Sequence, residues 1–149
     1  MSTRSYTLAL TQLACGIIAL ALPLVVIILY ATLVFRPERA AEDIYLLHDF
    51  AWLMLIAVAP PPALQAITIG WAVLTDKNEQ VVFPRWLGFF CLWVGILFIP
   101  GMFAIFFKTG PFAWDGILAF WLPLSIFFVW VGVLAWKIIS LARGSRGGN

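Results

Sequence analysis

The chain alternates between long uncharged runs and short segments that carry the charges. Four runs contain no Asp, Glu, Lys, Arg or His side chain: Leu8–Phe35, Phe50–Thr75, Trp86–Phe107 and Gly116–Trp136. A helix that spans a bilayer needs about 20 apolar residues, and a charge at its centre costs roughly 3 kcal/mol on the insertion scale. The pattern therefore predicts four membrane-spanning helices, at about 8–35, 48–75, 86–107 and 115–137.

Composition supports lipid as the surrounding medium. Of the 149 residues, 64% are hydrophobic and only 11% are charged, whereas about a quarter of the residues of a soluble domain are charged. The net charge of +2 comes with no basic stripe, so nucleic acid is not an expected partner. We predict an all-α polytopic membrane protein in which residues 1–149 form a single domain.

The connections and the basic residues predict the topology. The segments 76–85 and 108–115 are too short for crossovers, so neighbouring spans should be antiparallel in an up-down-up-down bundle. One side would hold Arg4, Lys77, Arg85, Lys137, Arg143 and Arg146, and the other Arg36, Arg39 and Lys108. The positive-inside rule then predicts a multi-pass protein with the N- and C-termini in the cytoplasm.

Three consecutive prolines, Pro60-Pro61-Pro62, interrupt the second run. A residue that precedes proline avoids the helical region, and proline cannot donate a backbone hydrogen bond. We therefore expect span two to be broken at Pro60–Pro62, between an outer half near 44–58 and an inner half near 62–74. The break either lines a binding site or is a kink, repaired by Gln65 and Thr68, whose side chains can bond the freed carbonyl groups.

The other spans carry Pro23, Pro100 and Pro123. Kinks at one depth would splay the bundle and open an apolar vestibule toward the outside. Its lining would draw on Trp52, Phe98, Phe103, Trp114, Phe120 and Trp121. The alternative is that these aromatic residues fill the core and form the interfacial belts common in membrane proteins.

His48 is the only histidine, and it adjoins Asp49 at the outer mouth of span two. It could bind a quinone headgroup, a metal or a proton, or be a structural polar group at the interface. The candidate ligand-binding residues are His48, Asp49, Trp52, Gln65, Phe98 and Trp121. No catalytic residue, metal ligand or cofactor is predicted, although a bound lipid, quinone or pigment would suit the apolar helices.

Small residues four apart suggest close helix contacts: Cys15 with Ala19, Ala66 with Gly70, and Cys91 with Gly95. In the segment before the last span, Asp115 is expected to cap the following helix through its side-chain oxygen. Lys108 either pairs with Asp115 or extends to the membrane surface.

The segment from Phe83 to Trp121 contains FPRWLG at the entry to span three and FFKTGPFAWDG before span four. On these motifs the chain resembles small, uncharacterised four-helix bacterial membrane proteins. The resemblance implies a four-helix membrane fold and carries no activity with it.

Three functions remain open. The leading hypothesis is an auxiliary subunit of a larger membrane complex, whose apolar aromatic helices pack against lipids and protein partners or a second copy. The alternative is an independent binder or carrier of an apolar small molecule, such as a lipid, quinone or sterol. An enzyme that uses His48 is the least favoured, because the sequence supplies no second polar group at that depth.

Overall fold

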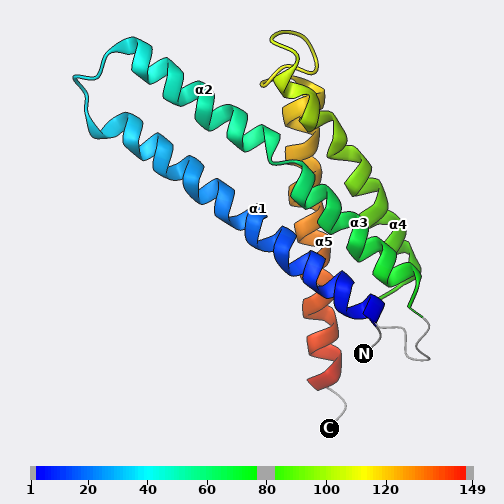
Figure 1. The fold of residues 1–149 in the computed structure, drawn as a ribbon. Helices are drawn as coiled ribbons and strands as arrows, with labels where there is room; N and C mark the ends of the chain where they lie inside the picture. The colour runs from blue at the N-terminus through cyan, green and yellow to red at the C-terminus, as the bar shows by residue number, and fades with distance from the viewer. Residues whose placement is uncertain (1–2, 77–82, 147–149) are drawn as a thin grey trace.

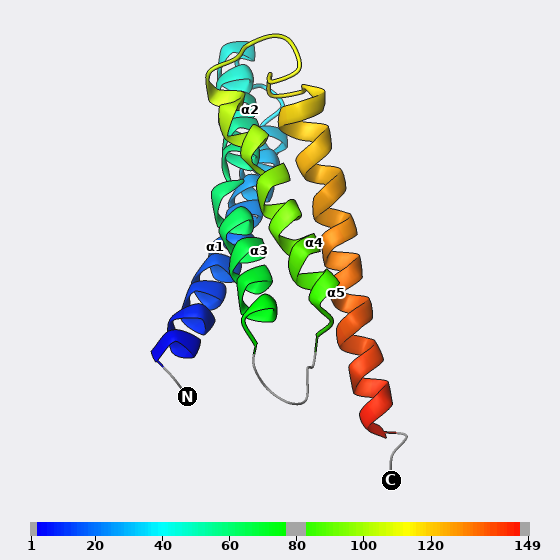
Figure 2. The ribbon, with the colours of Figure 1, turned by 90° about the vertical axis from the view of Figure 1, so that its right-hand side faces the viewer.

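The structure is a computed structural model that describes residues 3–76 and 83–146. The elements follow one another as α1 (Thr3–Phe35), α2 (Ala41–Ala57), α3 (Pro60–Leu74), α4 (Arg85–Leu97), η1 (Ile99–Ile105), η2 (Ile117–Trp121) and α5 (Leu122–Arg146). The chain runs up, down, up and down (Figures 1 and 2). We call the end that holds the start of α1 and the end of α5 the terminal end, and the opposite end the loop end.

Four helical stretches are long and apolar enough to cross a membrane: Tyr6–Phe35, Ala41–Leu74, Arg85–Ile105 and Ile117–Arg143. These confirm the predicted all-α bundle of four spans, and the protein is a multi-pass membrane protein. The second stretch begins earlier than the sequence suggested. Glu42 and Asp43 lie in the first turn of α2, where carboxylates interact favourably with the helix dipole.

The predicted break in span two is confirmed, but the prolines lie after it rather than in it. Pro60 begins α3, and the interruption falls at Val58 and Ala59. The N–H groups in the first turn of a helix have no acceptor within that helix, so proline, which lacks an N–H group, is tolerated there. The Ala59 N–H group reaches back to the Ile56 carbonyl at 3.3 Å, and the Ala59 carbonyl accepts the Ala63 N–H group at 3.1 Å.

The expected repair by Gln65 is not observed. Within the described residues, no hydrogen bond joins its side-chain amide to the carbonyl groups at the break. The amide nitrogen instead faces α1, where a Cβ atom on Gly16 would lie 3.3 Å from it. Thr68 donates its hydroxyl hydrogen to the Gln65 carbonyl at 2.9 Å, one turn further from the break.

The tightest helix contact joins α3 to α4, where small residues meet. A Cβ atom on Gly70 would lie 2.7 Å from the Gly88 carbonyl oxygen, and one on Gly95 would lie 3.2 Å from the Ala63 carbonyl oxygen. The predicted close contacts of Gly70 and Gly95 are therefore confirmed. Beside this seam lies the main buried cluster: Ala63, Ala66, Leu87, Cys91, Val94, Phe98 and Trp130.

Three irregular segments meet toward the loop end. The break at Ala59 packs against Gly101 of η1, a 3₁₀ helix, because a Cβ atom on Gly101 would lie 3.2 Å from the Ala59 Cβ atom. The same Cβ atom would lie 3.3 Å from the Ala119 carbonyl oxygen of η2, a π-helix. Ile56, Ala104 and Ala119 form a second buried cluster at this junction, with Trp52 and Phe120 packed against it.

The loop between η1 and η2 is held by backbone contacts. The Pro111 carbonyl accepts hydrogen bonds from the Leu118 and Ala119 N–H groups at 2.9 and 3.3 Å. Gly116 occupies the N-cap of η2, and no side chain caps this helix. The expected cap by Asp115 is therefore wrong, because the loop carbonyl already takes the donors at the helix start.

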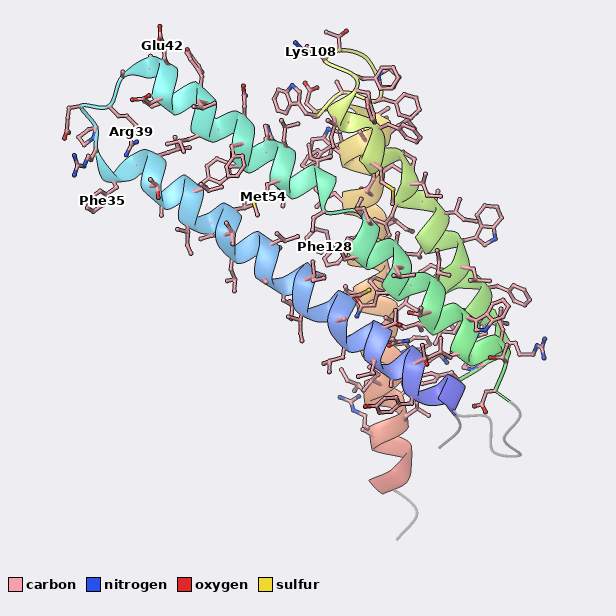
Figure 3. The ribbon with its side chains drawn as sticks, viewed as in Figure 1. Phe35, Arg39, Glu42, Met54, Lys108 and Phe128 are labelled. Carbon is pink, nitrogen blue, oxygen red and sulfur yellow. The ribbon has the colours of Figure 1, made fainter. Side chains whose placement is uncertain are left out.

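The helix α1 and the far half of α2 lean away from the rest of the bundle (Figure 1). Only 6% of the most apolar stretch of α1 is buried. At the loop end, Arg39 turns back toward α1 (Figure 3), and its Nη2 atom lies 3.5 Å from the Thr32 carbonyl oxygen. Most of α1 therefore presents its side chains to the surrounding lipid.

Candidate functional site

An apolar pocket of about 170 Å³ opens beside the break in span two. We call it the break pocket. Its lining comes from α1, both halves of span two, η2 and α5: Ala19, Pro23, Leu55, Ile56, Val58, Ala59, Pro62, Phe98, Ala119, Phe120, Pro123, Leu124 and Phe127. Three of the four proline sites predicted to kink the spans thus contribute to one pocket.

The position of the break pocket follows from the way the helices pair. The helix α1 packs on α2 and α3, whereas α5 packs on α4 and η2. Ala19 and Pro23 of α1 face the pocket from one side, and Pro123 and Phe127 of α5 face it from the other. The pocket therefore lies where these two helix groups part, within the membrane-spanning region.

The lining of the break pocket limits what it can hold. Its side chains offer no charged or hydrogen-bonding group. An apolar cavity of about 150 Å³ in a protein core stays dry and takes up a molecule the size of benzene. The break pocket therefore suits part of an apolar chain or ring rather than a polar solute.

A second group of residues gathers at the loop end around His48, and we call it the mouth cluster. The His48 ring lies 6.0 Å from the ring of Tyr30, 6.4 Å from Trp52 and 6.4 Å from Trp114. The Trp52 and Trp114 rings are 5.5 Å apart and tilted by 50°. Three separate segments, α1, α2 and the η1–η2 loop, thus meet at one aromatic cluster.

Beside the mouth cluster lies a pocket of about 340 Å³, which we call the mouth pocket. Its lining is Asp49, Trp52, Leu53, Ala104, Ile105, Phe107, Lys108 and Trp114. The His48 Nδ1 atom lies 3.9 Å from Asp49, whose side chain is 76% exposed. Among the described residues no carboxylate forms an ion pair with Lys108, so of the two alternatives for this lysine the pairing with Asp115 is not observed.

The candidate residues from the sequence separate into three groups. His48, Asp49 and Trp52 lie together at the mouth. Phe98 lines the break pocket and is 3% exposed. Gln65 and Trp121 line neither of these pockets. Trp121 is 55% exposed and stacks edge-on against Phe120 at 5.2 Å.

The aromatic residues expected to line one vestibule are divided between two pockets. Phe98 and Phe120 line the break pocket, whereas Trp52 and Trp114 line the mouth pocket. One residue from each lining meets the other, because the ring centroids of Trp52 and Phe120 are 5.0 Å apart. Phe103 lies outside both and contacts Phe112 at 6.2 Å.

Sequence reasoning missed the residues that α1 brings to these sites. Ala19 and Pro23 line the break pocket, and Tyr30 contacts His48. Tyr30 carried a usable signal, because it is an aromatic residue near the loop end of its span. Ala19 was singled out only for a close helix contact with Cys15, because a small residue within an apolar run does not indicate which pocket it lines.

No set of three or more metal-binding side chains comes together among the residues that the structure describes. Comparison with known proteins adds no assignment: no protein-family model, curated protein or solved structure matches this chain. The two pockets and their chemistry are therefore the basis for a functional argument.

Proposed function

We propose that this protein binds an apolar chain-bearing molecule of the membrane, such as a lipid or a quinone, with part of the chain in the break pocket. The observation that carries the proposal is the pocket itself, an apolar recess of about 170 Å³. Backbone that departs from a regular helix at membrane depth is tolerated where it faces protein or a cavity. Broken helices commonly form binding sites in membrane transporters.

The helix arrangement offers a lateral route into this pocket. Because α1 pairs with α2 and α3 while α5 pairs with α4 and η2, a chain can approach from the bilayer between α1 and α5. A ligand that enters from lipid gains little from the hydrophobic effect, since the bilayer is equally apolar. Shape and packing in the pocket must therefore supply the selectivity.

Filling the break pocket tests the proposal. We expect Ala19→Phe to reduce the apolar molecules retained by the purified protein about tenfold, because overfilling a packed site costs about 1–3 kcal/mol. Native mass spectrometry after mild detergent extraction measures the retained mass. Ala21→Phe is the matched control, since Ala21 lies on the exposed face of α1. Equal retention by both variants and the parent protein would contradict the proposal.

A second candidate is an auxiliary subunit of a larger membrane complex. It is supported by α1, which buries only 6% of its most apolar stretch against the rest of the chain and leaves its flank open to partner helices. Gentle solubilisation followed by sizing and mass spectrometry should then recover a second chain or a further copy. A homogeneous monomer under these conditions would exclude this role.

We propose a bacterial inner membrane with both termini in the cytoplasm. Arg39 and Lys108 lie toward the loop end (Figure 3). Arg85 begins α4, and Lys137 and Arg143 lie in the last part of α5, at the terminal end (Figure 1), which the positive-inside rule associates with the cytoplasm. The mouth pocket would then face the outer leaflet. A C-terminal reporter active only in the cytoplasm tests this orientation.

A further inference from the structure

The mouth pocket combines two opposite charges with two aromatic faces, and this combination limits the ligand that it can hold. Lys108 extends from the top of the η1–η2 loop at the loop end (Figure 3), and Asp49 enters the pocket from α2. Lys108 forms no ion pair within the described chain, and Asp49 approaches only His48, at 3.9 Å. Both charges are therefore available to groups outside the protein.

From this arrangement we infer that the mouth pocket binds the zwitterionic headgroup of a phospholipid, a phosphodiester joined to an ammonium group. The Lys108 ammonium would contact the phosphate as a point charge. The lipid ammonium would lie near Asp49 and against the aromatic surface that Trp52 and Trp114 contribute to the lining, where their rings pack together with centroids 5.5 Å apart. Aromatic faces attract quaternary and primary ammonium groups through the ring quadrupole.

The depth of the two pockets fits a lipid of one leaflet. Asp49 lines the mouth pocket and Ala59 lines the break pocket. These residues are separated by about 15 Å along the helix axis, at about 1.5 Å per residue. Because α2 slants together with α1 (Figure 1), the difference in depth is smaller than this and fits within one half of the hydrocarbon core, a layer about 15 Å thick. The headgroup inference rests on the proposed function, because it assumes that the attached chain reaches the break pocket.

Lipid competition in detergent micelles tests the headgroup. The protein is titrated with phosphatidylcholine and with phosphatidylglycerol of the same acyl chains, and native mass spectrometry counts the bound lipids. We expect the parent protein to prefer the zwitterionic lipid roughly fivefold, since partly exposed ion-pair and cation–π contacts are individually modest. Asp49→Asn should remove most of this preference, whereas Lys108→Gln should weaken the binding of both lipids about equally, because both carry the phosphate.

Two control variants keep the charge change and move it away from the mouth pocket. Asp43→Asn changes an acid near the start of α2, which does not line the mouth pocket. Lys137→Gln changes a lysine toward the terminal end, where its ammonium lies over the rings of Trp86 and Trp136. Asp43→Asn should retain the headgroup preference, and Lys137→Gln should retain the affinity for both lipids. If these controls lose as much as the matching mouth variants do, overall charge and not the pocket is responsible, and the inference falls.

The remaining outcomes separate this inference from the proposed function. Lipid retention that is sensitive to Ala19→Phe but shows no headgroup preference would leave the break pocket as the ligand site and overturn the headgroup assignment. A soluble compound, glycerophosphocholine, distinguishes the source of the headgroup. Saturable binding of this compound that equals the lipid in affinity and is unaffected by Ala19→Phe would identify a free solute and overturn the lipid assignment.

Discussion

Gly70→Ala is expected to lower the free energy of unfolding by about 1–3 kcal/mol, the usual cost of adding a group to a packed contact. The new Cβ atom would lie 2.7 Å from the Gly88 backbone carbonyl and 3.0 Å from Leu92 Cγ. A backbone atom cannot rotate aside as a side chain can, so α3 and α4 would have to separate. Thermal unfolding in detergent, followed by circular dichroism, measures the change.

Gly132→Ala provides the control for this substitution. Gly132 lies in α5, and nothing lies within 4 Å of the position that its Cβ atom would take. Alanine has the higher helix propensity, by about 1 kcal/mol in an open helical site. We therefore expect this variant to be as stable as the parent or slightly more stable. A lower unfolding temperature for Gly70→Ala, with an unchanged or higher one for Gly132→Ala, would support the close contact of α3 with α4. An unfolding temperature of Gly70→Ala equal to that of the parent protein would refute it.

Gly116→Ala is expected to disrupt the η1–η2 loop and to lower the free energy of unfolding by about 2–4 kcal/mol, because the N–H groups of the half-buried Leu118 and the buried Ala119 lose their acceptor. A Cβ atom at position 116 would clash with the Pro111 carbonyl oxygen and would lie 2.8 Å from the Gly110 carbonyl oxygen. Since the Pro111 carbonyl accepts the Leu118 and Ala119 N–H groups, displacing it removes both hydrogen bonds. The unfolding midpoint reports the loss of stability.

The same variant has a second, functional readout. Lys108 and Trp114 belong to the displaced loop, so Gly116→Ala should also lose the lipid headgroup preference of the mouth pocket. Gly110→Ala is the comparison within this loop. Gly110 has a φ of 88° but open space around its Cβ position, so only backbone strain of about 1–2 kcal/mol is expected. Equal losses in the two variants would contradict the role given to the Pro111 carbonyl.

The four spans and their up-down order were predictable because lipid imposes a simple rule on sequence. Each span had to lack charge over about 20 residues, and Leu8–Phe35 shows this without ambiguity. The position of the break was less accessible. Proline disfavours helical backbone in the residue before it, but proline itself can be the first residue of the next helix, as Pro60 is. The sequence alone could not distinguish a break at the prolines from one just before them.

The candidate site was predictable only where polarity marked it. His48, Asp49 and Trp52 lie within about one turn of each other in α2, so their proximity followed from spacing. Contacts between spans depend on helix rotation and tilt, which the apolar pattern barely constrains because most faces of these helices are apolar. This is why Trp121 was expected in the site although it lies outside both pockets, and why Ala19 was expected at a helix contact but not in a pocket.

The length of the first span has a consequence for how the protein sits in its membrane. Its apolar part, Tyr6–Phe35, covers 30 residues, or about 45 Å at a rise of about 1.5 Å per residue. The hydrocarbon layer is only about 30 Å thick. If α1 stood perpendicular to the membrane, several of its apolar turns would be exposed to water. We therefore expect this helix to cross obliquely, in keeping with its slant against α5 (Figure 1). Hydrophobic mismatch, in addition to side-chain packing, therefore sets the angle of α1.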